Sequence, residues 1–371
     1  MSAGASELRA TSAEAAAGAR PARARLPRPR LDRVGVPVAL LIAAALAFAP
    51  FVTFRENRIV AGNGLGLAEV FGVREALLLQ LAGALAIGLV LLRSPAVWRA
   101  VLGFALLLGL GAVHGQTPAH LAGEAHPLAR VSPASGTWLL AFAFAILVVD
   151  ALARLRLAPP ARLAVLAGVL AALGALFHAG WWDGLSVMQE YALREDSFRQ
   201  EAAWRHLALS GASVLAALAV GLPLLNGAQT IPSIALYGLL MVPLGLLAAL
   251  FLYALLPIVS GTAIGLLQLP AQTREAAVAM GMSASQRLFA VELPLALPVI
   301  LGSVRIVLVQ NIGLTAVAAL IGGGFGTLIF QGIGQSAEDL VLLGAIPTIA
   351  LALVAAVLFE AAIAFARGTR Q

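Results

Sequence analysis

Three histidines stand at a regular spacing of six residues in one polar stretch of the chain. They are His114, His120 and His126, and imidazole nitrogens are common ligands of Zn²⁺. The spacing does not match the helical pattern of two ligands, and no cluster of carboxylates accompanies it. We therefore interpret residues 114–136 as a solvated loop, and we predict neither a metal site nor a cofactor.

The basic residues restrict the available chemistry further. All 24 of them are arginine, so the chain has neither a Gly-Lys-Ser/Thr phosphate-binding loop nor a Schiff-base lysine. The chain also has no cysteine, which excludes thiol catalysis, disulfides and cysteine-ligated metal. We predict that the chain has no catalytic residue. If it acts in an ATP-driven process, the ATP site must belong to a partner.

One polar stretch, Glu275–Pro294, has a pattern suited to contact with another protein. It reads EAAVAMGMSASQRLFAVELP. Thr273 can cap a first helix in which Glu275 suits the positive end of the helix dipole. The small alanines Ala276 and Ala277 form helix well and let another backbone approach closely.

The second half of this stretch predicts a turn and another helix. Gly281 suits the left-handed position that ends a helix. Ser283 and Gln286 have the spacing of a capping box that starts the next helix. Pro294 is expected to break that second helix before the following membrane segment. The sequence therefore predicts a helix, a glycine turn and a second helix.

The composition places most of the chain in a membrane. Hydrophobic residues make up 61% and charged residues 11%, and the mean hydropathy is +0.95 over 371 residues. A membrane-spanning helix needs roughly 20 apolar residues, so we predict an all-α polytopic membrane protein with about ten transmembrane helices. The expected spans are 34–54, 76–92, 100–113, 137–153, 163–178, 207–225, 231–244, 245–264, 297–320 and 340–365.

Arginine bias gives the orientation, because cytoplasmic loops are enriched in basic residues. Residues 1–33 form a disordered basic tail, which we expect to lie in the cytoplasm and to meet anionic lipid rather than nucleic acid. Arg367 and Arg370 hold the other end inside, so both termini are predicted to be cytoplasmic. Residues 183–206 have more acids than arginines and predict a short amphipathic helix at the outer surface.

The Glu-Ala-Ala of residues 275–277, Gly281 and the Val-Glu-Leu-Pro of residues 291–294 resemble the signature loop of permease subunits in bacterial binding-protein-dependent ABC importers. The resemblance implies a C-terminal five-helix type I (MetI-like) permease core in the bacterial inner membrane. It implies three kinds of partner: a cytoplasmic ABC ATPase, an extracytoplasmic substrate-binding protein, and a second permease copy or paralogue. The residues that would couple to the ATPase are Glu275, Ala276, Ala277, Gly281, Arg287, Leu293 and Pro294.

Further matches point to one branch of that family. Residues 229–233, 256–258, 291–298 and 321–324 are similar to permeases for glycine betaine, choline and related quaternary amines. The resemblance implies import of such osmoprotectants. The chain departs from the pattern in a short link at 226–229, in a tight turn at 243–245, and at Ser260–Gly261, where relatives often have an arginine and an asparagine.

The features divide the chain into three parts. They are the basic tail 1–33, an accessory bundle of about five spans at 34–200, and a permease core at 201–371 with the coupling loop at 271–294. All the gate-like and coupling features follow Leu207, whereas the first five spans are plain and apolar.

Few residues within the spans are candidates for the transport pathway or its gate. They are Tyr237, Tyr253, Gln310, Asn311, Gly322, Gly323 and Gly324. Polar groups at membrane depth usually face the bundle interior, and a quaternary cation can pass along aromatic faces. Hydrogen bonding between helices is the alternative role for the polar residues, and a tight turn is the alternative for the glycines.

Two other classes of function compete with an importer subunit. A secondary transporter or channel is disfavoured because the spans contain almost no acids, and Asp150 and Glu360 lie near cytoplasmic ends. A polytopic membrane enzyme would need a cluster of titratable groups at one depth, and the sequence shows none.

Overall fold

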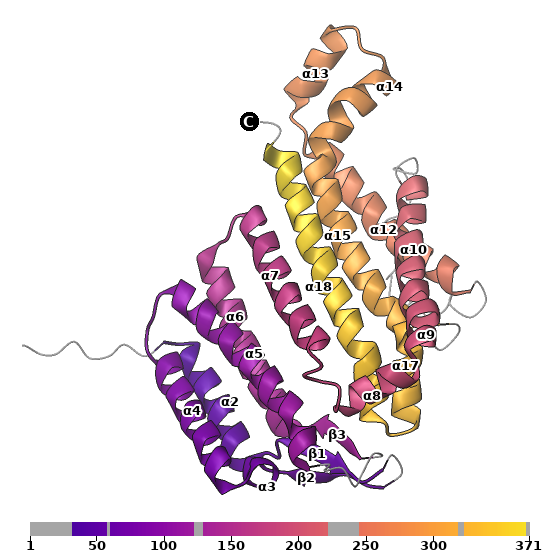
Figure 1. Cartoon of the computed structure of the whole chain (residues 1–371). Helices are drawn as coiled ribbons and strands as arrows, with labels where there is room; N and C mark the ends of the chain where they lie inside the picture. Colours follow the sequence, from indigo (N-terminus) through magenta and orange to yellow (C-terminus); the bar gives the residue numbers. More distant parts are fainter. Residues whose placement is uncertain (1–31, 58–59, 122–128, 222–244, 318–322, 369–371) are drawn as a thin grey trace, which may run out of the picture.

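The computed structural model describes residues 32–57, 60–121, 129–221, 245–317 and 323–368, and these residues are mostly helical (Figure 1). The elements of the N-terminal half are α2 (Gly35–Phe48), β1 (Val52–Arg55), β2 (Asn63–Leu65), α3 (Leu67–Phe71), α4 (Val73–Leu91), α5 (Ala96–Leu121), β3 (Arg130–Pro133), α6 (Ser135–Leu155) and α7 (Pro159–His178). The following elements are α8 (Ser186–Leu193), α9 (Glu195–Ser197), the π-helix η1 (Phe198–Trp204), α10 (Arg205–Gly221), α12 (Leu246–Leu267), α13 (Ala271–Ala279), α14 (Ala284–Arg287), the π-helix η2 (Leu288–Glu292), α15 (Leu293–Val317), α17 (Phe325–Gly334) and α18 (Glu338–Gly368).

Eight helices in the described part of the chain are long and apolar enough to cross a membrane. They correspond to eight of the ten predicted spans. The first predicted span corresponds to α2, which has only 14 residues before the chain turns into β1. The seventh predicted span, 231–244, and the short link at 226–229 lie outside the described residues.

Helices α2, α4, α5 and α6 pack together, and with α7, which follows them in the chain, they are called here the accessory bundle (Figure 1). Its interior is apolar and is centred on α2 and α6, where Val38, Ile42, Ala143 and Leu147 are fully buried. Helix α7 lies at the side of this bundle and contacts α18. It has no buried residue of its own, so most of its apolar surface is open to lipid or to a partner.

A three-stranded antiparallel sheet closes one end of the accessory bundle, in the order β2-β1-β3. No strand was predicted here, because residues 55–75 lie between the first two expected spans and residues 114–136 were interpreted as a solvated loop. The sheet is formed by residues from distant parts of the chain, with Val52 opposite Leu65 on one side and opposite Pro133 on the other. Thr137 ties α6 to the sheet by donating a hydrogen bond to the carbonyl of Phe51 at 2.5 Å.

Helix α5 is the largest correction to the predicted spans. The predicted span 100–113 was short, but α5 continues for 26 residues through Pro118. A proline removes the hydrogen bond to the carbonyl four residues earlier, here that of His114. The Thr117 hydroxyl donates to that carbonyl at 2.7 Å instead, so the helix continues without an unpaired group.

The predicted histidine loop is therefore wrong for two of its three residues. His114 is buried inside α5, with its ring 5.9 Å from that of Phe51 in an edge-on contact. His120 lies in the last turn of α5, 3.5 Å from a carboxylate oxygen of Glu75. His126 lies outside the described residues.

A network of four charged side chains fixes the opposite end of the accessory bundle. Arg99 is 1% exposed and lies 3.2 Å from Asp32 and 3.5 Å from Asp150. Arg154 reaches the same two carboxylates at 3.0 and 2.9 Å. Burial raises the pKa of the Asp32 carboxyl, but hydrogen bonds from backbone N–H groups and the two guanidinium groups outweigh it and hold that pKa below its usual range.

Helices α10, α12, α15 and α18 form a second bundle, called here the core helices. Val214, Ala254, Ile258, Val304 and Val307 meet in its interior. Helices α12 and α15 cross where Gly261 faces Ser303, and a Cβ at position 261 would overlap with the serine side chain. This close crossing leaves room only for glycine at position 261, where the resemblance described above would lead one to expect a larger residue.

The segment between the two bundles is helical, with one side buried and the other exposed. Elements α8, α9 and η1 run on into α10, and they pack Phe198 and Ala202 against α17 and α18. The predicted amphipathic helix is present, but its Glu190 is fully buried and contacts Arg130 at 3.3 Å and Arg194 at 3.0 Å. The sequence could not show this, because Arg130 is 60 residues away.

Ion pairs join the accessory bundle to α18 at both of its ends. At the start of α18, Arg55 lies 3.2 Å from Glu338, and Arg130 lies 3.7 Å from Asp339. Near the end of α18, Arg162 of α7 pairs with Glu360. Both acids at the helix start also suit the positive end of its dipole.

Candidate functional site

Helices α13 and α14 form a hairpin that projects beyond the ends of α15 and α18 (Figure 1). The predicted helix, glycine turn and helix are all present. Gly281 has φ +75°, and a Schellman pair of bonds ends α13: Met282 N–H donates to Ala277 O at 3.2 Å, and Gly281 N–H donates to Val278 O at 2.9 Å. The glycine therefore reverses the chain at the tip of the hairpin.

The second arm begins with the predicted capping box. The Gln286 N–H donates to the Ser283 hydroxyl at 3.3 Å, and the Ser283 N–H donates to the Gln286 side chain at 2.9 Å. Two local predictions were wrong. Thr273 does not cap α13, because that helix already begins at Ala271 after Pro270.

Pro294 was also expected to break the second arm, but it does not. The arm passes through the π-helical turn η2 directly into α15. A π-helical turn changes which carbonyl each N–H pairs with, and π-helical segments are a common way to absorb an irregularity within a helix. Residues 284–317 therefore form one helix from the hairpin into the membrane.

A buried carboxylate holds the base of the hairpin to the bundle. Glu292 is 8% exposed, and its Oε1 lies 2.9 Å from Arg287 Nε and 3.4 Å from Arg274 Nε. Arg274 also donates to the carbonyl of Leu266, near the C-terminus of α12, at 2.7 Å. The cluster therefore ties both arms of the hairpin to α12, and it rigidifies the hairpin as a unit.

Arg287 was predicted from the sequence, but its partner Glu292 and the second arginine on that carboxylate, Arg274, were not. The signal that could have found them is a single acid, Glu292, between apolar neighbours immediately before a membrane span. Such a charge is rarely buried without a paired group of opposite sign.

Three large apolar side chains of the hairpin are exposed. Val278 is 55% exposed, Met280 is 71% exposed and Phe289 is 69% exposed. Glu275 and Ala276 are exposed as well, whereas Ala277 faces inward and is buried. Leu293 is half-buried and Pro294 exposed at the base. Apolar groups gathered on a projecting element are typical of a protein contact surface.

A buried polar residue links three of the core helices. Asn311 of α15 is fully buried, and its amide donates to Ser213 Oγ of α10 at 2.9 Å and to Leu250 O of α12 at 3.4 Å. The carbonyl oxygen of the Asn311 side chain has no partner within the described residues. Asn311 therefore holds the helices together, and among the described residues its side-chain oxygen stays an unpaired acceptor inside the bundle.

Of the other candidate pathway residues, Tyr253 lies beside Leu250, whose carbonyl accepts the Asn311 amide. Tyr253 is 6% exposed and packs in an apolar cluster with Ala249 and Leu250. Gln310 is exposed on the outside of the bundle. Tyr237 lies outside the described residues.

The glycine stretch before α17 lies over the start of α10. Gly323 has φ +116° and Gly324 has φ +93°, so both need the backbone freedom of glycine. A Cβ at Gly324 would lie 3.1 Å from the ring of His206, which itself stacks near Phe325 at 4.8 Å. Gly322 lies outside the described residues.

A hollow of about 330 Å³ opens beside these glycines. Arg194, Glu201 and Arg205 line it, together with Gly323 and Gln331. It lies at the end of the bundle opposite the hairpin, so the charged hollow and the hairpin are at the two ends of the core helices.

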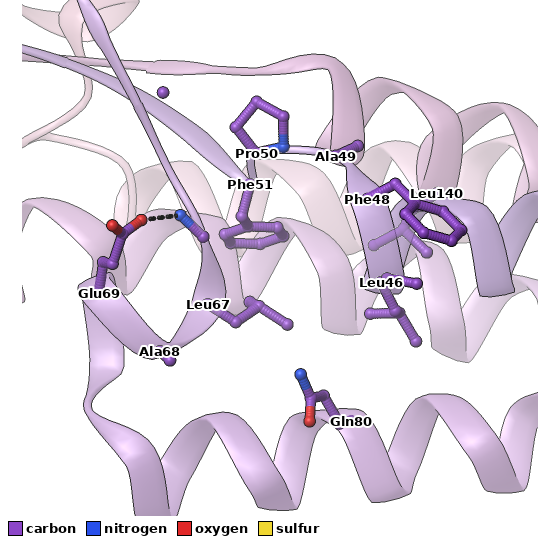
Figure 2. A pocket seen from close by; sticks show the side chains of 14 residues that line it. Leu46, Phe48, Ala49, Pro50, Phe51, Leu67, Ala68, Glu69, Gln80 and Leu140 are labelled. Atoms are coloured by element: carbon purple, nitrogen blue, oxygen red, sulfur yellow. Dashed lines mark hydrogen bonds between the residues drawn. The ribbon is translucent and has the colours of Figure 1, made fainter.

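A further hollow, of about 490 Å³, lies in the accessory bundle at the junction of α2, α3 and α4 (Figure 2). Most of the residues that line it are apolar, with Phe51 and Leu67 at its wall, and Gln80 directs its amide into it from α4. The Glu69 carboxylate is already hydrogen-bonded within the protein, because it accepts the N–H of Gly66 at 2.6 Å. The hollow has no group arranged for catalysis.

The described residues contain no group of three His, Cys, Asp or Glu side chains placed to hold a metal ion. Buried charged residues have partners of opposite charge: Arg99 pairs with Asp32, and Glu292 pairs with Arg287. The arrangement places the hairpin at one end of the core helices and the charged hollow at the other end, with the buried amide of Asn311 inside the bundle.

Comparison with known families divides the chain in two. Residues 32–188 match the model described as the N-terminal domain of the ABC transporter permease YehY. Residues 219–367 match the model described as the binding-protein-dependent transport system inner membrane component. The second match includes the hairpin, Asn311 and the glycines before α17.

Several characterised proteins are similar to the second half. The osmoprotectant import permease protein OsmW of Salmonella typhimurium is 40% identical over 193 residues, which are 44% of this chain and 89% of that protein. The carnitine transport permease protein OpuCD of Listeria monocytogenes is 34% identical over 200 residues, 47% of this chain and 90% of that protein. The choline transport system permease protein OpuBD of Bacillus subtilis is 35% identical over 192 residues, 45% of this chain and 85% of that protein.

Proposed function

We propose the function of this chain from its family, the inner membrane components of binding-protein-dependent transport systems, to which it belongs. It is a multi-pass membrane subunit of an ATP-driven importer, a channel subunit rather than a catalytic one. The proposed cargo is a small quaternary amine such as glycine betaine, choline or carnitine. The names of the similar permeases support this class of substrate.

The single observation that carries the proposed mechanism is the clamped hairpin. In this proposal, the exposed apolar side chains of Val278, Met280 and Phe289 dock onto a cytoplasmic ATPase. The Glu292 cluster makes the hairpin rigid, so movement of the ATPase reaches α12 and α15 rather than bending the loop. The charged hollow beside Gly323 and Gly324 is the proposed outer gate, where a substrate-binding protein delivers its cargo.

A second permease copy or paralogue is part of the proposal, and Gln310 supports it. This amide is exposed in the last third of a membrane-spanning helix, seven residues before the helix ends at Val317. Polar side chains at membrane depth rarely face lipid. A partner permease against this side of α15 would cover Gln310 and place the pathway between the two copies.

The direct test is an uptake and co-purification experiment. The chain is expressed with the ATPase and the binding protein encoded beside it, and labelled choline and glycine betaine are supplied. We expect ATP-dependent uptake, and an ATPase that co-purifies with the chain. A Met280→Asp variant should lose most of the bound ATPase, because a charge replaces an apolar contact.

The matched control is Leu193→Asp. Leu193 of α8 is 72% exposed, almost the same as Met280, but it lies on the side of the molecule opposite the hairpin. This variant should keep its ATPase. Equal retention of ATPase by both variants, or its absence from the wild-type preparation, would contradict the docking proposal.

We also propose that the accessory bundle is separable from the core. The division falls near residue 186 rather than within η1, because Phe198 and Ala202 pack against α17 and α18. The same co-purification with residues 186–371, given an insertion signal, tests this division. A fragment that inserts but binds no ATPase would assign the accessory bundle to the working core.

The proposed orientation has the hairpin and both termini in the cytoplasm, with α8 outside. A phosphatase reporter that is active only outside the cytoplasm should be inactive when fused after Gln371. The same reporter inserted after Leu193 should be active. An active reporter at Gln371 would reverse the orientation.

A further inference from the structure

A hollow of about 580 Å³ lies between the accessory bundle and the core helices, and the proposed transport role does not use it. Its walls come from the start of α7, the first half of α15 and the last turns of α18. Arg162, Pro298, Gly302, Arg305, Glu360 and Arg367 line it. It lies toward the end of the bundle that carries the hairpin, since the hairpin leads into the start of α15.

The charged side chains that line this hollow carry a net positive charge. Three guanidinium groups face one carboxylate, that of Glu360, which leaves two positive charges in excess. Arg162 pairs with Glu360 and donates through Nε to the carbonyl of Leu157 at 2.9 Å. Arg305 lies 3.9 Å from Glu360, and within the described residues Arg367 has no carboxylate partner.

The three arginines are accessible to whatever fills the hollow. The side chains of Arg162 and Arg305 are 39% and 36% exposed, and Arg367 is exposed at the end of α18. The planar guanidinium group binds phosphate oxygens through two parallel N–H bonds. An excess of two charges suits a singly or doubly charged phosphate group.

The surface that continues from the hollow is apolar. Leu173 lies eleven residues after Arg162, which is three helical turns along nearly the same face of α7. Leu173 is 39% exposed, and Leu170 near it is 44% exposed. A cationic end followed by an exposed apolar row matches a phospholipid, whose phosphate and acyl chains are arranged in the same order.

We propose that this hollow binds the phosphate head group of an anionic phospholipid, with its acyl chains along α7. Arg162, Arg305 and Arg367 hold the head group, and each comes from a different helix. The lipid therefore joins the accessory bundle to the core at the point where Glu360 alone would link them. Basic pockets between membrane helices bind such head groups in other proteins.

The test compares lipids and variants of the full chain in nanodiscs. One set contains phosphatidylcholine only, and the other contains phosphatidylcholine mixed with phosphatidylglycerol. The thermal midpoint of each preparation is measured, together with the lipid that mass spectrometry finds on the purified protein. We expect phosphatidylglycerol to raise the midpoint of the wild type and to remain bound to it.

The double variant Arg305→Gln/Arg367→Gln should bind phosphatidylglycerol about tenfold less tightly and lose most of the rise in midpoint, because two charge-assisted contacts are removed. The matched control is Arg156→Gln, at the exposed C-cap of α6 outside the hollow. It should behave like the wild type. If the double variant does not fold, Arg367→Gln alone supplies the comparison, since this residue is exposed at a helix end.

A final experiment distinguishes binding of a lipid from binding of a free phosphate ion. Inorganic phosphate is added to the wild type in phosphatidylcholine nanodiscs. It should not reproduce the rise that phosphatidylglycerol gives, because it lacks the acyl chains. An equal rise with inorganic phosphate would overturn the lipid assignment, and an equal rise in wild type and double variant would overturn the site.

Discussion

Replacing Gly281 with valine should lower substrate uptake at least about tenfold while the amount of chain in the membrane stays normal. The structure identifies the cause as backbone strain. Gly281 has φ +75°, and a Cβ added there would meet nothing within 4 Å. A residue with a side chain costs about 1–2 kcal/mol in this conformation, and a β-branched one is a genuine outlier. The turn would open, and the hairpin would lose the shape that docks.

Because steric space is not the problem, a matched control is available. Asparagine tolerates the left-handed conformation better than other residues. A Gly281→Asn variant should therefore retain most of the uptake, although its side chain is about as large as valine's. Uptake is measured at equal membrane abundance, with ATPase activity recorded in parallel. Equal loss in both variants would point to a contact at Gly281 instead of a conformational requirement.

Removing the Asp32 carboxylate should destabilise the accessory bundle by about 3 kcal/mol or more. Asp32 is 4% exposed, and it neutralises Arg99, which is 1% exposed. Its Oδ1 also accepts the N–H groups of Val34 and Gly35 at 2.9 and 3.0 Å, at the start of α2. An Asp32→Ala variant leaves a buried guanidinium short of a partner and the helix start uncapped. Thermal denaturation of the purified chain measures the effect.

The control is another aspartate in an ion pair, but at the surface. Asp196 lies 3.1 Å from Arg199, and the two side chains are 89% and 65% exposed. Asp196→Ala should leave the denaturation midpoint almost unchanged, because exposed pairs contribute little. A midpoint that falls equally in both variants would show that the network around Arg99 is not a stabilising element.

The lowered pKa of Asp32 gives the same prediction a pH dependence. The folded-state pKa lies below the ordinary value of 3.8. The stabilisation is therefore complete above that ordinary value and is lost as the pH falls through the folded-state pKa. The difference between the wild type and Asp32→Asn should accordingly disappear in strong acid and persist at neutral pH.

The hairpin could be predicted from the sequence because its determinants are local. The Schellman turn at Gly281 and the capping box at Ser283 need only residues within one or two turns of each other. The apolar spans were predictable for a similar reason, since each is a run of consecutive residues. The ends of helices were less predictable: Pro118 and Pro294 are both accommodated, one by a threonine hydroxyl and the other next to a π-helical turn.

The features that could not be predicted depend on residues far apart in the chain. The sheet pairs residues near position 53 with residues near position 132. His114 looked like part of a polar loop, but the aromatic ring of Phe51 covers it. The proposed lipid site combines arginines from positions 162, 305 and 367, and no pattern in the sequence brings them together. Asn311 was selected by its polarity, but its two partners on α10 and α12 were not foreseeable.

The uninterrupted helix at residues 284–317 has a mechanical consequence. At a rise of 1.5 Å per residue, its 34 residues make a rod about 51 Å long. One end is the second arm of the hairpin, and Asn311 and Thr315 lie near the other. Glu292 lies about a quarter of the way along this helix, and the two arginines that bind it fix the helix at that point. If the proposed ATPase docking tilts the helix at Ala284, the longer part of the helix behind Glu292 should move farther than the shorter part in front of it.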